Sequence, residues 1–261
     1  PPFFFQDHPG NRDPLWSRGL GDVYKRQVII ELANILHKNP PPFGINLVLF
    51  DAEDYGVPGD NWTYCIGSQY FAQNLPIPYP EYSINIDMVA DRQPEFFIER
   101  ISYQQNAPLV LELWELSEKL GLKAFKKQAR HAVFDDHVPL YEIAGIPAVN
   151  IIDFDFPNDR VNYHLTHNDI VQNCSPEGMR QVGTLLVNHI YNYDKENLYN
   201  ISIIGDSHAR QYIYPIIALL ENDKFNVKTN ILDSCISLPN LISDMEIWAD
   251  KNYIAKCTNH Y

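Results

Sequence analysis

Hydrophobic residues recur along the chain at two different spacings. From Val28 onward a spacing of three to four residues, typical of one helix face, joins Ile29, Leu32, Ala33 and Leu36. The segment "NPPPFG", residues 39–44, stops this pattern, because proline and glycine end helices. The run "INLVLF", residues 45–50, then places β-branched, aliphatic and aromatic residues over the length of a buried strand. The pattern predicts a helix followed by a strand.

The same alternation continues to about Tyr191. The sequence predicts helices at residues 67–75, at residues 109–120 and after Ser175, and strands at "YSINIDM" (82–88) and "IPAVNIIDF" (146–154). Gly121 is the expected C-cap of the second helix, and Ser175 with Pro176 begins the last one. Strands that alternate with helices predict an α/β fold, in which helices cover both faces of a mainly parallel mixed sheet.

Composition narrows the class of partner. The chain has 261 residues, 45% of them hydrophobic, which is enough for a packed core. Its formal charge of -13 repels phosphates, so we expect no nucleic-acid partner. The four cysteines are scattered without a CxxC pair, which leaves the redox compartment open. Because no apolar run approaches about 18 residues, we expect no membrane-spanning segment in this chain.

Both ends of the chain differ from its middle. "GDVYKRQ", residues 21–27, resembles a translated transposon-adapter end of the kind that contaminates sequencing libraries, so we expect residues 1–27 to be a non-native or disordered leader. The alternative is an ordinary loop-rich arm. Residues 28–193 form the first expected domain, and the polar residues 194–200 form a linker or join. A new strand-turn-helix pattern then predicts a partial second α/β unit at residues 201–261.

Acidic residues and histidines stand where predicted strands end. In parallel α/β sheets the carboxyl ends of the strands meet at one crevice, so these residues are expected to converge. Carboxylates and imidazoles suit a catalytic zinc, which needs about three ligands and a nearby carboxylate base. Taken alone, each residue is more typical of a solvated turn, a helix cap or a hydrogen-bonded core histidine. The residues concerned are Asp51, Glu53, Asp54, Asp87, Asp135, Asp136, His137, His164 and His167.

The order of these motifs resembles that of the zinc aminopeptidase and glutaminyl cyclase family. "LVLFDAEDYG", "GSQYFA", "INIDMVAD", "DDHVPLYEIAGIPAVNII" and "YHLTHND" follow one another from Val28 to about Asn192 as they do in that family. The resemblance implies a zinc-exopeptidase-like fold, one or two zinc ions, and the N-terminus of a peptide as substrate. It further implies a general base, Glu53; zinc ligands, Asp54 and His164; a second-metal ligand or catalytic acid, Asp87; and a carboxylate hydrogen-bond network, Asp135.

The sequence also departs from the family pattern. His164 and Asp169 are five positions apart rather than four, and Leu165 occupies the usual histidine position. Either a one-residue insertion keeps His164 as the ligand, which we favour, or His167 replaces it. The family's upstream histidine motif and bridging aspartate are missing before Val28, and Asp7 and His8 are weak substitutes. We therefore expect a truncated chain with a poor zinc site and little or no activity. Relatives are often exported, so an exported location is expected from resemblance alone.

The last part of the chain suggests a different chemistry. "IIGDSHARQ", residues 203–211, resembles the first block of SGNH hydrolases and acyltransferases, which implies Ser207 as a nucleophile. A simple Gly-Asp-Ser turn explains the same residues. The main hypothesis is an aminopeptidase-type zinc hydrolase. The alternatives are a glutaminyl-peptide cyclotransferase that uses one zinc, an SGNH serine esterase or acyltransferase fragment, and a chimeric reading frame without activity.

Overall fold

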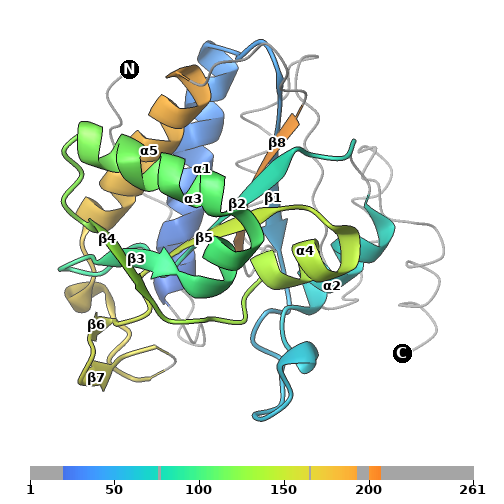
Figure 1. Cartoon of the computed structure of the whole chain (residues 1–261). Coiled ribbons are helices and arrows are strands. Elements are labelled where there is room, and N and C mark those ends of the chain that lie inside the picture. The colour runs from blue at the N-terminus through green and yellow to red at the C-terminus, as the bar shows by residue number, and fades with distance from the viewer. Residues whose placement is uncertain (1–19, 76–77, 165, 193–199, 207–261) are drawn as a thin grey trace, which may run out of the picture.

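A four-stranded parallel sheet forms the centre of the protein. The computed structural model describes residues 20–75, 78–164, 166–192 and 200–206. The strand order in this sheet is β1 (Gly44–Phe50), β8 (Asn200–Asp206), β2 (Tyr82–Asp87), β5 (Ala148–Ile152) (Figure 1). A second, parallel pair joins β3 (Phe96–Glu99) to β4 (Phe125–Arg130), and a short antiparallel pair joins β6 (Pro157–Asn158) to β7 (Val161–Asn162). The predicted mainly parallel α/β architecture is confirmed.

Helices cover both faces of the sheet. The main core lies under α1 (Leu20–Lys38), α3 (Arg100–Lys119) and α5 (Pro176–Asn192), whereas α2 (Ile66–Asn74) and α4 (His137–Ala144) cover a smaller core (Figure 1). Successive strand residues point to opposite faces of a sheet. Accordingly, Leu49 packs in the main core while Val48 and Phe50 pack in the smaller one. Two short 3₁₀ turns, η1 (Asn61–Thr63) and η2 (Val171–Asn173), complete the described elements.

Strand β8 lies inside the main sheet, although the sequence predicts a separate unit from residue 201. It pairs in parallel with β1 on one side and with β2 on the other. Ile203 is buried in the main core and Ile204 in the smaller core, so this strand contributes to both faces. The boundary at residues 193–200 and the unit at 201–261 stay predictions, because residues 193–199 and 207–261 lie outside the described residues.

Two helices differ from the sequence-based boundaries. Helix α1 begins at Leu20 rather than at Val28, so it includes "GDVYKRQ", and both Arg26 and Val28 are buried. Helix α3 bends at Asn106, because Pro108 cannot continue a regular helix; the Asn106 side chain accepts the N–H of Leu109 at 3.3 Å. Within the described residues, none of the helices is both long and apolar enough to span a bilayer.

Candidate active site at the carboxyl edge of the sheet

All four strands of the main sheet end at an aspartate on the same edge. Asp51 directly follows β1, Asp206 ends β8, Asp87 ends β2, and Asp153 directly follows β5. The strands are in register there, since Phe50 pairs with Asp206 and Asp87 pairs with Ile152. Four different parts of the sequence therefore end their strands at one edge, as expected for a parallel sheet.

The turn after β1 is pinned to the start of α2. Three backbone hydrogen bonds join the two segments, with the N–H groups of residues 65–67 donating to the carbonyls of residues 53, 52 and 51 at 2.9–3.2 Å. Gly67 is required there, because a Cβ at this position would lie 2.3 Å from the carbonyl oxygen of Asp51. Ala52 adopts a positive φ of 58° and turns the chain sharply. This turn leaves Glu53 half-buried at the edge and Asp54 exposed to solvent.

Three carboxylates from two turns form the tightest acidic group. One oxygen each of Glu53, Asp135 and Asp136 lies within 4.8 Å of the others. Asp135 and Asp136 are buried in the turn that leads into α4. Glu53 and Asp135 thus converge, whereas Asp54, Asp87 and His164 are not members of this group. Among the described residues it is the one cluster of three acidic, histidine or cysteine side chains that meets this spacing.

Asp136 is the residue that the sequence did not single out for a role. In the sequence, Asp136 is only one of the possible donors in the "DDH" run. Its burial depends on how α4 packs on the sheet, which the sequence pattern does not show. Asp135, by contrast, has hydrogen bonds on both oxygens. The side-chain amide of Asn150 donates to one at 2.6 Å, and the N–H of Asp136 donates to the other at 2.6 Å. Asn150 in turn accepts from Asn85, its partner in register on β2, at 3.2 Å.

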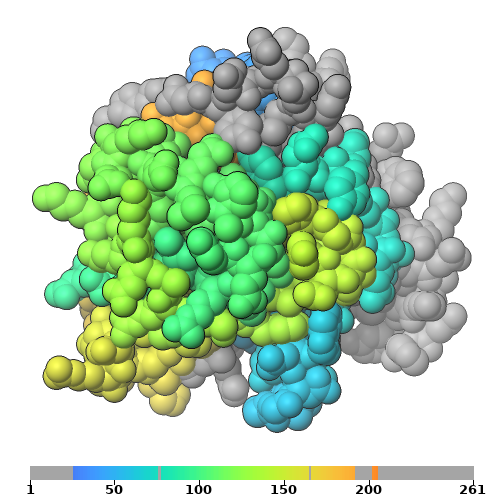
Figure 2. All heavy atoms as spheres, viewed as in Figure 1, coloured from blue at the N-terminus to red at the C-terminus, as the bar shows by residue number. Residues whose placement is uncertain are grey.

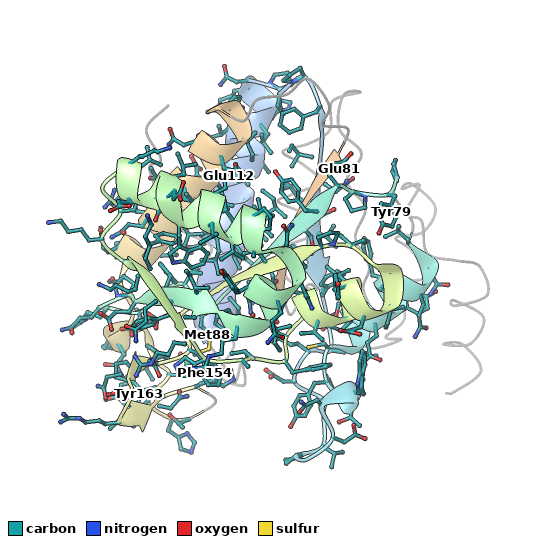
Figure 3. All side chains as sticks on the ribbon, viewed as in Figure 1. Tyr79, Glu81, Met88, Glu112, Phe154 and Tyr163 are labelled. Carbon is teal, nitrogen blue, oxygen red and sulfur yellow. The ribbon has the colours of Figure 1, made fainter. Side chains whose placement is uncertain are left out.

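Asp87 and His164 meet through Met88. One oxygen of Asp87 accepts the N–H of Met88 at 2.7 Å, and Nδ1 of His164 lies 3.0 Å from the Met88 sulfur. Figure 3 labels Met88 together with Phe154 and Tyr163, which lie on the same side of the molecule. His164 is half-buried against the end of β2, whereas His167 is exposed.

Of the two histidines, His164 is the one that lies against the end of β2. Leu165, which occupies the family's histidine position, and Ser207, the predicted nucleophile, lie outside the described residues. Their roles stay predictions.

Not every acid at this edge is charged at neutral pH. The pKa of Asp153 is raised to about 8, mainly by burial. The hydrogen bond from the backbone N–H of Glu95 lowers this pKa, whereas the nearby negative charges of Asp91, Asp155 and Glu95 raise it. Burial likewise raises the pKa of Asp91. Asp155 differs because Arg130 and His131 contact its carboxylate at 3.0 and 2.9 Å. The edge at β5 therefore holds a protonated acid, Asp153, beside an ion pair.

An aromatic wall stands beside the acidic group. Phe134 directly precedes Asp135, and its ring meets the Trp62 ring edge to face at a centroid distance of 5.2 Å. Trp62 is 47% exposed and belongs to the loop of residues 53–66, where Tyr55, Val57 and Ile66 are also exposed. Figure 2 shows this loop projecting from the body of the protein in light blue.

The residues present fit a divalent cation. The carboxylates of Glu53, Asp135 and Asp136 converge at the turn that also carries Asp54, and Asp87 with His164 adds an acid and an imidazole at the neighbouring strand end. Zinc accepts both donor types.

Comparison with known proteins identifies the family. Residues 26–190, more than half of the chain, match the family described as Peptidase family M28. The chain belongs to peptidase family M28. A curated relative, aminopeptidase YwaD of Bacillus subtilis, is 28% identical over 176 residues, which are 63% of this chain and 35% of that protein. The resemblance to zinc peptidases is confirmed.

Solved structures agree with this assignment. A Zn-dependent exopeptidase from Parabacteroides distasonis is 31% identical with a TM-score of 0.57, and a glutaminyl cyclase from Tannerella forsythia gives the same two values. In both comparisons the match covers 64% of this chain and 60% of the other. The M28 chain thus spans about a third of the length of the aminopeptidase and less than two thirds of these structures.

Proposed function

We propose that this M28 chain is a zinc-dependent hydrolase that acts on peptide N-termini, as an aminopeptidase does. The observation that carries the proposal is the convergence of Glu53 with Asp135 and Asp136 at the carboxyl edge of the sheet. Family membership supplies the reaction class, and the relative named as an aminopeptidase supports the peptide substrate.

The side chains divide the chemistry as follows. Glu53 is the general base that accepts a proton from the attacking water. Asp54, Asp87 and His164 are the candidate zinc ligands, and Asp87 serves instead as a catalytic acid if one ion is bound. Zinc, when bound, supplies Lewis acidity towards the scissile carbonyl. Asp135, fixed by Asn150, orients the Glu53 carboxylate, and the Trp62–Phe134 wall holds an apolar substrate group and excludes water.

A glutaminyl-peptide cyclotransferase is the second candidate. The Tannerella cyclase matches this chain as closely as the Parabacteroides exopeptidase does, so the fold alone does not favour either reaction. In the cyclase reaction Glu53 would accept the proton of the substrate's own amine rather than that of water. The serine chemistry at Ser207 and the chimeric reading frame stay untested predictions.

One assay separates these functions. The full chain is supplied with zinc and tested on aminoacyl p-nitroanilides and on a peptide with N-terminal glutamine. We expect low turnover of the anilides, loss of that turnover with a chelator, and no turnover by Glu53→Gln, which keeps zinc because it removes the base and no ligand. Glu118→Gln is the matched control and keeps the activity, because Glu118 is an exposed acid of α3 that pairs with Lys127. Turnover that survives both the chelator and Glu53→Gln would refute the zinc mechanism and direct attention to Ser207.

A further inference from the structure

Glu99 joins the acidic turn to the body of the protein. It ends β3, caps α3, and is 2% exposed. Its two oxygens accept the N–H groups of Ile101 and Ser102 at 2.9 and 2.6 Å, which is ordinary capping of the helix. The same two oxygens also contact the segment that carries the acids: one accepts the N–H of Val133 at 3.0 Å, and the other lies 3.3 Å from Nε2 of His137. The turn of Asp135 and Asp136 lies between these two contacts.

A second path leads from Glu99 to the same turn. The hydroxyl of Ser102 donates to Glu99 at 2.7 Å and accepts the backbone N–H of Asn150 at 2.9 Å. The side chain of Asn150 donates to Asp135 at 2.6 Å. Both paths begin at the buried Glu99 carboxylate.

The charge of Glu99 is secure. Burial raises its pKa, but the His137 contact and the two backbone N–H groups of the cap outweigh burial and lower the pKa to about 2. The carboxylate therefore remains an acceptor for all of its donors across the pH range in which a peptidase works.

We propose that Glu99 is a positioning residue that keeps Asp135 and Asp136 within reach of Glu53 and, because Glu53 directly precedes the candidate ligand Asp54, so sets the cation affinity of the site. This inference rests on the proposed function, because the cation is the one that the hydrolase requires. Capping alone explains the bonds to residues 101 and 102 but not those to Val133 and His137. Outer partners that orient residues at a metal site typically change its affinity 10–100-fold when they are removed.

The test uses Glu99→Gln in the full chain, which keeps the shape but loses the charge and one acceptor. Ser102→Ala, which removes only the hydroxyl bridge, is a milder second variant. The matched control is Gln181→Met. Gln181 is also buried, and its side chain accepts the backbone N–H of Ala124, which is distant in sequence, at 2.8 Å. This contact lies at the opposite end of the β3–β4 pair from Glu99. Hydrogen exchange at the amides of residues 133–138 measures the turn, and cobalt(II) binding with its absorption spectrum measures the cation site.

We expect Glu99→Gln to speed exchange at residues 133–138 by about tenfold or more, to weaken cobalt binding about 10–100-fold and to alter its spectrum. Ser102→Ala should change the same signals less, and Gln181→Met should change neither. Exchange that is unaltered at residues 133–138, or that rises equally over the whole protein, would overturn the inference. If the unmodified chain binds no cobalt, the proposed function fails, and hydrogen exchange alone still decides the role of Glu99.

Discussion

Replacing Asn150 by alanine tests whether the buried amide holds the acidic turn. The substitution removes the 2.6 Å bond to the Asp135 carboxylate and the 3.2 Å bond from Asn85. A hydrogen bond to a charged group contributes about 1.5–3 kcal/mol and a neutral one about 1 kcal/mol. Asn150 is fully buried, so water does not replace it without rearrangement. We therefore expect the free energy of unfolding to fall by about 3 kcal/mol.

Urea unfolding followed by tryptophan fluorescence measures this loss, because Trp114 is buried in the main core. Asn74→Ala is the control: Asn74 is exposed and bonds only within its own helix, so its change should stay within about 0.5 kcal/mol. Asp135→Asn, alone and combined with Asn150→Ala, completes a double-mutant cycle. A coupling energy below about 0.5 kcal/mol, or a loss for Asn150→Ala no larger than that of the control, would show that the two side chains act independently.

Two further predictions concern the edge and the wall. The pKa of Asp153 in the folded protein, about 8, lies above its ordinary value of 3.8, so its contribution to stability is complete below pH 4 and is lost as pH rises towards 8. Asp153→Asn should therefore flatten the pH dependence of the free energy of unfolding, measured in urea at pH 5–8, and an unchanged pH dependence would refute this. Trp62→Ala should raise KM about tenfold for substrates with apolar N-terminal side chains, with little change in kcat. The measurement compares leucyl with alanyl anilides, and equal effects on both substrates would refute a substrate-binding role for the Trp62–Phe134 wall.

The sequence predicted the elements whose pattern is local. Strands β1, β2 and β5 and helix α5 lie close to their predicted ranges, because hydrophobic spacing and caps are contained within each segment. The place of β8 could not be predicted in this way. Pairing of parallel strands joins residues that are far apart in sequence. The polar run before residue 201 resembles a linker, and it does not show which sheet the following strand joins.

The site residues also divide into those that a local pattern predicts and those that depend on contacts between distant residues. Glu53 and Asp135 were predictable because acids at the ends of parallel strands share one edge. Glu99 and Asn150 gave no signal, since a buried acid in a strand and an asparagine in an apolar run contradict ordinary preferences. Their partners explain them: Glu99 bonds Val133, 34 positions away, and Asn150 bonds Asn85, 65 positions away. Such partners are visible only once the chain is folded.

The aspartates at this edge have a structural task as well as a chemical one. Asp51, Asp87 and Asp135 each accept the N–H of the next residue at 2.6–2.7 Å. The residues after Asp51 and Asp87, Ala52 and Met88, have positive φ angles, a conformation that costs energy for any residue other than glycine. The aspartate oxygen stabilises this sharp turn, and the turn directs the following residues across the strand ends. Glu53, two positions after Asp51, is brought in this way to Asp135 and Asp136. An acid that ends a strand here therefore builds the backbone of the site before any metal binds.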